Sequence, residues 1–191
     1  FDSLFDLTRI DAGNYKVRLQ NVDVLQLFAE LATQFEPVAA GKSLKFRTYA
    51  KPTTLWADPV VLRRILGNLL SNAFRHTRRG GVLLGLRRRE DVLVFEVWDT
   101  GVGIAREHQQ AIFQEFFRVS QHQGTEDSLG LGLTIVSKLT TLMGYQLALS
   151  SEAERGSVFR VLLPAYTQKS ALETATTPDI VVPRSAAQAS G

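Results

Sequence analysis

Residues 58–77 read DPVVLRRILGNLLSNAFRHT and contain the clearest helical pattern of the chain. Asp58 can cap the first free N–H groups of a helix, and the proline after it is favoured at the first helical position. From there apolar side chains recur every three or four positions as far as Ala73. We therefore expect a helix from Pro59 to His76 with one broad face in the protein core.

The polar residues of this stretch share another face of the same helix. Asn68 and Asn72 lie four positions apart, and Arg75 and His76 follow one turn later. Amide oxygens suit a hard cation, while the arginine and the histidine can donate to phosphate. A helix face in contact with water would show the same residues, so this stretch alone leaves both interpretations open.

A second polar segment follows a predicted strand. Residues 82–89 and 92–99 alternate as two strands of a hairpin, and residues 99–104 read DTGVGI. The glycines let the backbone approach a flat ligand, and Asp99 can accept a hydrogen bond from an exocyclic amine such as that of adenine. A structural turn is the alternative interpretation.

A third segment opens a further helix. Residues 130–133 read GLGL, and the helix is expected to run from Gly130 to Met143. Free backbone N–H groups at such a helix start can hold phosphate oxygens, helped by the helix dipole. The chain contains neither the G-x-G-x-x-G dinucleotide pattern nor a G-x-x-x-x-G-K-[ST] phosphate loop.

The remaining sequence predicts more helices and strands. Further strands are expected at 15–22, 43–50, 145–151 and 157–164, helices at 24–40 and 105–117, and a polar loop at 119–129. Helices and mostly antiparallel strands in this order predict an α+β fold, a two-layer sandwich with a mixed sheet and helices on one face.

Composition excludes several classes of protein. The 191 residues are 45% hydrophobic and 21% charged, and there is no cysteine. A disulfide framework, a thiolate zinc site and a cysteine nucleophile are therefore excluded. The formal net charge of +3 gives no indication of nucleic-acid binding. The chain begins with Phe1, so we expect a cytoplasmic piece of a longer protein whose other part can carry a membrane anchor or a sensor.

Taken together and in this order, the segments resemble the Bergerat ATP-binding fold, and specifically the catalytic and ATP-binding domain of two-component sensor histidine kinases. The resemblance covers about residues 16–165. Its four motifs match at 62–77 (N box), 98–104 (G1 box), 112–118 (F box) and 130–136 (G2 box). Residues 151–164 resemble the closing hairpin of the domain, and residues 6–13 resemble the end of a dimerisation and phosphotransfer helix.

This resemblance implies roles on the phosphate side of a nucleotide site. Asn72 would hold the Mg²⁺ that bridges the ATP phosphates, with Asn68 in support. Arg75 would contact phosphate, and His76 would line the nucleotide. Arg118 would reach the terminal phosphate and act with Asn72 in catalysis.

On the base side, the resemblance implies that Asp99 accepts the adenine amino group. The implied nucleotide-binding set is completed by Gly101, Gly103, Ile104, Phe117, Gly130, Leu131, Gly132 and Leu133. Phe116 and Phe117 would pack under a lid, although core packing would also explain Phe113 and both of these residues. Ser128 stands where the family usually has glycine, and because serine disfavours positive φ we expect a differently shaped, stiffer lid hinge.

The resemblance leaves kinase and hydrolase as alternatives, and one position separates them. Hydrolases of this fold place a glutamate four residues before the metal-binding asparagine, where this chain has Asn68, and losing a general base costs roughly 10²–10⁴-fold in rate. Transfer of the γ-phosphoryl group to a histidine is therefore expected. None of the three histidines precedes an acidic residue, so the acceptor is expected outside this chain. A degenerate regulatory nucleotide-binding module and an anti-sigma-type Ser/Thr kinase are the alternatives.

The domain organisation follows from the same resemblance. Residues 1–13 would end a dimerisation and phosphotransfer helix, 14–166 would form the catalytic domain, and 167–191 would be a linker or disordered tail. The expected partners are ATP, the histidine-bearing dimerisation domain of the same full-length protein and a downstream response regulator. The full-length protein is expected to be a homodimer and this fragment a monomer.

Overall fold

The computed structural model describes residues 15–90, 92–117 and 130–164. Its elements are β1 (Gln20–Asp23), α2 (Val24–Gly41), β2 (Lys45–Tyr49), β3 (Thr54–Ala57), α3 (Pro59–His76), β4 (Gly81–Arg89), β5 (Val92–Asp99), the 3-10 turns η1 (Arg106–His108) and η2 (Ala111–Phe113), α4 (Gly132–Leu142), β6 (Gln146–Glu152) and β7 (Gly156–Leu163). The predicted N-terminal helix end (1–13), the polar loop (119–129) and the tail (167–191) lie outside the described residues.

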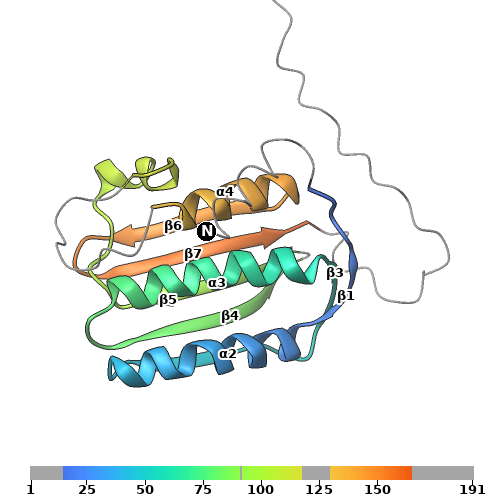
Figure 1. Ribbon diagram of the computed structural model, residues 1–191, viewed down its shortest axis with the longest axis horizontal. Coiled ribbons are helices and arrows are strands. Elements are labelled where there is room, and N and C mark those ends of the chain that lie inside the picture. The colour runs from blue at the N-terminus through green and yellow to red at the C-terminus, as the bar shows by residue number, and fades with distance from the viewer. Residues whose placement is uncertain (1–14, 91, 118–129, 165–191) are drawn as a thin grey trace, which may run out of the picture.

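The strands form one central sheet and one small sheet. The central sheet has the order β2-β4-β5-β7-β6, and only the β2–β4 pair is parallel. β1 and β3 pair separately and antiparallel. Helices α2, α3 and α4 lie together on one face of the central sheet, with α3 in the middle (Figure 1). The predicted two-layer α+β sandwich is confirmed.

The core lies between the three helices and the sheet. Along β5, Leu93, Phe95 and Val97 alternate toward the helices and are buried. Of the three helices, α3 contributes the most buried apolar side chains to this core. Among them are Leu62, Ile65, Leu66, Leu69 and Leu70, each at most 1% exposed. Complete burial of one such side chain stabilises the fold by about 1.5–3 kcal/mol. Within the described ranges, no helix is both long enough and apolar enough to cross a bilayer.

The start of α3 follows the predicted capping chemistry. The Asp58 carboxylate accepts from the backbone N of Val60 at 2.9 Å and of Val61 at 3.2 Å. Its other oxygen accepts from the backbone N of Arg18 at 2.8 Å, so the same side chain fixes the segment that enters β1. At the opposite end, Lys42 Nζ donates to the Phe74 carbonyl at 2.6 Å. The predicted helix from Pro59 to His76 is confirmed at both ends.

Four predicted elements need correction. The helix predicted over 105–117 is wrong: only η1 and η2 form there. Residues 106–110 are all polar, so no continuous apolar face runs along the stretch, and Phe116 has a φ of 61°, which does not fit an α-helix. The helix predicted from Gly130 to Met143 begins at Gly132, since Gly130 has a φ of 69°. The strand predicted over 15–22 forms only at β1, and the helix predicted over 24–40 ends one residue later, at Gly41, followed by Ser43 with a φ of 55°. β3 was not predicted, because four residues carry too little periodicity.

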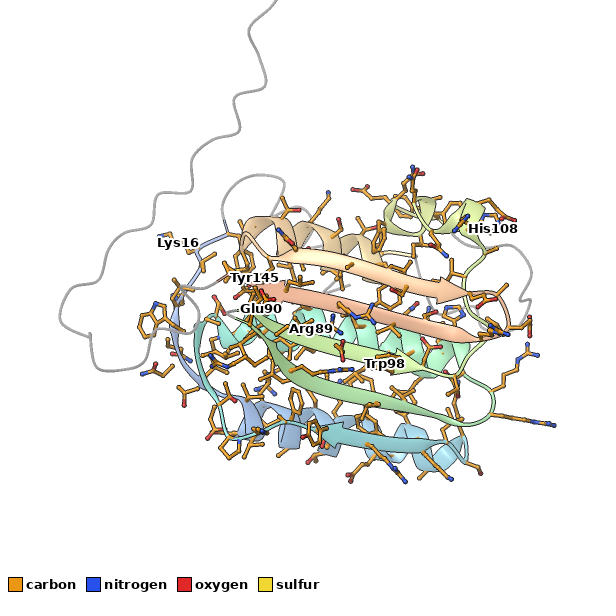
Figure 2. The ribbon with its side chains drawn as sticks, turned by 180° about the vertical axis from the view of Figure 1, so that it is seen from behind. Lys16, Arg89, Glu90, Trp98, His108 and Tyr145 are labelled. Atoms are coloured by element: carbon orange, nitrogen blue, oxygen red, sulfur yellow. The ribbon has the colours of Figure 1, made fainter. Side chains whose placement is uncertain are left out.

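The second face of the central sheet is covered by side chains alone within the described part of the chain. Figure 2 shows this face from behind, with Trp98 and Arg89 labelled. At its centre Glu96 is only 2% exposed and accepts from Arg87 Nε at 2.7 Å, Arg160 Nε at 3.0 Å and Trp98 Nε1 at 3.2 Å. Burial raises the pKa of Glu96, but the hydrogen bonds from Trp98, Arg160 and Arg87 outweigh it and hold the pKa below its ordinary value.

Candidate functional site

Helix α3 touches both glycine-containing segments predicted to bind a ligand. Near its middle, a Cβ added at Gly132 would lie 3.2 Å from Asn68 Oδ1, so the start of α4 lies against Asn68. At its C-terminal end, the His76 carbonyl accepts from Val102 N at 3.3 Å, and a Cβ at Gly101 would lie 2.5 Å from the same oxygen. The structure therefore brings both segments into contact with the helix that carries the predicted polar residues.

The polar residues of α3 present amide oxygens between these two contacts. Asn68 is half-buried, and its Nδ2 donates to the Arg64 carbonyl at 2.8 Å, which leaves Oδ1 on the side of Gly132. Asn72 is half-buried too, and within the described residues no hydrogen bond is made by its side chain. Arg75 and His76 are exposed one turn later. This polar face of α3 therefore passes from half-buried to exposed side chains and is not uniformly in contact with water.

Asp99 ends β5 with its carboxyl group almost buried. It is 9% exposed, and its Oδ1 accepts from the backbone N of Gly101 at 2.8 Å. Burial raises the pKa of Asp99, while backbone N–H groups of Gly101 and Ser157 act in the opposite direction. A carboxylate with so little water around it is a strong acceptor for a donor group on a ligand.

The loop of residues 100–104 is held by its own protein contacts. Thr100 Oγ1 donates to the Arg79 carbonyl at 2.9 Å and accepts from Gly81 N at 3.0 Å. Gly103 has a φ of 65°, and a Cβ there would lie 1.9 Å from the Glu152 carbonyl oxygen. The predicted structural turn is thus present, and close packing alone already requires glycine at this position.

Three residues that the sequence did not suggest anchor the same loop. Ser151 Oγ accepts from Ile104 N at 2.8 Å and lies 2.9 Å from Ser157 Oγ. Gln109 Nε2 donates to the Ile104 and Ser151 carbonyls, both at 3.0 Å. Ser151 and Ser157 occupy inward positions of β6 and β7, where apolar residues would be expected, and this exception to the pattern could have identified them from the sequence. No such signal marks Gln109.

The segments on either side of residues 118–129 lie against one another. A Cβ at Gly130 would lie 3.2 Å from the Phe116 Cα and from the Phe117 carbonyl oxygen, and Lys138 Nζ pairs with Glu115 at 2.9 Å. Leu131 is buried and Leu133 half-buried.

The three phenylalanines of the predicted F box have different surroundings. Phe113 packs edge-on against Phe159, with ring centres 6.4 Å apart, as the core interpretation predicts. Phe117 is half-buried with its ring 6.0 Å from that of His108, whereas Phe116 is 61% exposed. Arg118 and Ser128 lie outside the described residues.

The donor set suits a metal that brings further ligands with it. In the described part of the chain, no cluster of three or more His, Cys, Asp or Glu side chains could hold a metal ion. Mg²⁺ commonly keeps several waters and binds through few protein oxygens plus substrate phosphates. The amide oxygens of Asn68 and Asn72 fit that manner of binding.

Comparison with known proteins agrees with this architecture. The family model described as "Histidine kinase-, DNA gyrase B-, and HSP90-like ATPase" matches residues 57–167, more than half of the chain. The chain belongs to this family of ATPases.

The curated relatives that match within this family of ATPases are sensor kinases. The sensor histidine kinase RcsC of Escherichia coli K12 is 31% identical over 171 residues, which are 85% of this chain and 18% of RcsC. A homologue of the aerobic respiration control sensor ArcB from Haemophilus influenzae is 34% identical over 147 residues, 75% of this chain and 45% of that protein. The chain thus spans less than half the length of these relatives.

The solved structures that match the chain are also histidine kinases. Full-length ShkA in complex with AMPPNP superposes with a TM-score of 0.79 at 29% identity, over 89% of this chain and 36% of ShkA. The nucleotide-free catalytic domain of the histidine kinase ThkA gives 0.66 at 25% identity, over 78% of this chain and 96% of that domain. The described chain is a histidine kinase-type catalytic, ATP-binding domain.

Proposed function

We propose that the chain binds Mg²⁺-ATP in this site and transfers the γ-phosphoryl group to a histidine on a dimerisation domain outside it, within a two-component signalling system. One observation carries the proposal: Asn68 lies against the start of α4, while the end of the same helix lies against the loop that follows Asp99. One helix thereby supplies residues to both ends of an elongated ligand.

The base side of the proposed site is built around Asp99. Its carboxylate would accept the amino group of adenine, and the backbone of Gly101 and Gly103 lies directly after it in the loop. Protein packing already fixes both glycines, so the base would meet a preformed surface. This arrangement favours a base that donates a hydrogen bond to the Asp99 carboxylate over a base that presents an acceptor there.

The phosphate side is built from α3 and α4. Among the described residues no side chain caps the start of α4, so we take its first N–H groups as donors to phosphate oxygens. Arg75 would add a positive charge beside them. Asn72, with Asn68 in support, would hold Mg²⁺, whose charge would reduce the repulsion between the triphosphate and an incoming nucleophile.

The proposed reaction needs no base from this domain. The bond between the γ-phosphorus and the β,γ-bridging oxygen breaks and ADP leaves with that oxygen, a bond from phosphorus to one imidazole nitrogen forms, and the proton of the other imidazole nitrogen passes to a base outside this chain. Positioning and charge neutralisation supply most of the catalysis in such transfers. α3 contains no carboxylate that could activate water, which disfavours hydrolysis as the main activity.

A degenerate regulatory module is the second candidate. Ser128 in place of a family glycine favours it, since the lid would close less readily over a nucleotide. The two candidates differ in phosphotransfer and not in nucleotide binding.

Titration with AMPPNP, with and without Mg²⁺, tests nucleotide binding. We expect Mg²⁺ to tighten binding strongly, Asn72→Ala to abolish that dependence, and Asp99→Ala to weaken binding under both conditions. Asn21→Ala, at an exposed asparagine of β1, is the matched control and should behave as the parent chain. Equal affinity with and without Mg²⁺ would contradict the assigned role of Asn72.

Phosphotransfer is tested by adding a histidine-bearing dimerisation domain in trans. We expect acid-labile, base-stable label from γ-labelled ATP on that domain and none on this chain. Nucleotide binding without any transfer would favour the regulatory module instead. Acid-labile label on the isolated chain would contradict an acceptor outside it.

A further inference from the structure

We propose that Ser151 and Gln109 are positioning residues for nucleotide binding, because they hold the loop of residues 100–104 against the β6–β7 hairpin before a nucleotide arrives. This inference rests on the proposed function, since it takes that loop to receive the base. Both residues lie outside the four motif segments, and neither was singled out by the sequence.

The two side chains satisfy both backbone groups of the last loop residue. Ile104 N donates to Ser151 Oγ at 2.8 Å, and the Ile104 carbonyl accepts from Gln109 Nε2 at 3.0 Å. Gln109 Nε2 also donates to the Ser151 carbonyl at 3.0 Å, so one amide group joins the loop to β6. Polar backbone groups in such a half-buried position are costly to leave without partners.

The connection continues from Ser151 to the start of the loop. Ser151 Oγ lies 3.0 Å from the Gly156 carbonyl and 2.9 Å from Ser157 Oγ. The backbone N–H of Ser157 in turn interacts with the Asp99 carboxylate. The two ends of the loop are therefore joined through β6 and β7 as well as through the loop itself.

The middle of the loop is held from two sides. Glu154 N donates to the Val102 carbonyl at 2.7 Å on the hairpin side, and Val102 N donates to the His76 carbonyl at 3.3 Å on the α3 side. A Cβ at Gly103 would overlap the Glu152 carbonyl. A loop fixed in this way loses little backbone freedom on binding, so more of its contact energy appears as affinity.

Alanine variants test the role directly. Ser151→Ala removes the acceptor for Ile104 N, and Gln109→Ala removes the donor to its carbonyl. Each should raise the dissociation constant for ATP roughly 5- to 10-fold, the effect of losing one such hydrogen bond. Because the change lies on the base side, the factor should be the same for ADP and ATP, and the same with and without Mg²⁺.

Conservative variants and a neighbour supply the controls. Ser151→Thr keeps the hydroxyl group and should restore affinity, whereas Gln109→Glu keeps the length without the donor and should not. Ser150→Ala changes the adjacent serine, which is exposed and bonds only Arg160 among the described residues, and should bind ATP as the parent does. Gln109 is half-buried and lies outside the apolar core, so substitutions there leave the core intact. The Gln109 variants therefore still test the inference if Ser151→Ala does not fold.

Calorimetric titration paired with thermal unfolding of the nucleotide-free chain decides the outcome. A lowered melting temperature with unchanged ATP affinity would show a purely structural role and overturn the inference. A loss specific to ATP over ADP, or to Mg²⁺, would also overturn it. In either case weakened binding by Asp99→Ala leaves the proposed function standing, whereas parental affinity in both Asp99→Ala and Asn72→Ala would remove the proposed function itself.

Discussion

At the scale of single residues, Asp99 combines position, burial and candidate chemistry. It ends β5, its carboxyl group is nearly out of contact with water, and its pKa is raised above 3.8, the ordinary value for aspartate. Two backbone N–H groups keep the carboxylate from being entirely without donors. A further donor from a ligand would therefore add a hydrogen bond to a partly satisfied group.

This raised pKa predicts how nucleotide affinity depends on pH. As pH falls through the raised pKa, Asp99 takes up a proton and loses acceptor capacity, so affinity for an ATP analogue should decline already at a pH above 3.8. Asp99→Asn should bind more weakly at neutral pH and lack this decline, which separates it from protonation of the base itself. Calorimetric titrations from pH 7 downward measure both proteins, and parallel profiles would contradict the assignment.

At the scale of elements, α3 could be predicted almost residue by residue, while β3 and the stretch 105–117 could not. Its cap, its proline and its apolar spacing are local features that agree with one another. By contrast, β3 forms because it pairs with β1 across more than thirty residues, and a four-residue segment carries no such information locally. The large apolar residues of the stretch 105–117 all lie within 112–117, so no apolar face runs along the whole stretch to stabilise a helix there.

The two aspartates that cap helices, Asp58 at α3 and Asp23 at α2, predict different losses in the free energy of unfolding when each is replaced by alanine. Asp58 is 3% exposed and accepts three backbone N–H groups, whereas Asp23 is exposed and accepts two. Asp58→Ala should lower the free energy of unfolding by about 2 kcal/mol or more, and Asp23→Ala by about 0.5–1 kcal/mol. Urea unfolding at pH 7 measures both, and equal losses would contradict the role of Asp58 in holding the segment before β1.

At the scale of the whole molecule, the two faces of the sheet are stabilised differently. Helices cover one face with apolar side chains, and Glu96 with its arginines and Trp98 covers the middle of the other. The layers and the three polar segments could be predicted from local pattern and from order along the chain. The Glu96 cluster and Gln109 could not, because their partners come from strands and turns that only the folded sheet brings together.

The Glu96 cluster predicts acid sensitivity of the fold. Because its folded-state pKa is lowered, the cluster contributes stability above 4.5, the ordinary value for glutamate, and loses it as pH falls from there through the folded-state pKa. Glu96→Gln should cost about 1–3 kcal/mol at pH 7, discounted because Arg87 is half-exposed, and this difference should shrink below pH 4.5.

A matched substitution separates this effect from a general response to charge removal. Glu152 pairs with Arg155 on the surface, with both side chains more than half exposed. Glu152→Gln should change the free energy of unfolding by roughly 0–1 kcal/mol at all pH values. Guanidinium unfolding curves between pH 3 and pH 7 compare the two variants, and similar losses from both would show that Glu96 has no special role.

The contact between the β6–β7 turn and the loop after Asp99 offers a practical use. Ala153 is exposed beside Glu154, whose backbone N bonds the loop at 2.7 Å. Since the chain has no cysteine of its own, Ala153→Cys would introduce one uniquely labelled thiol. A fluorophore attached there would turn the hairpin into an optical reporter of ligand arrival, because the backbone of Ala153 packs against Gly103 of that loop.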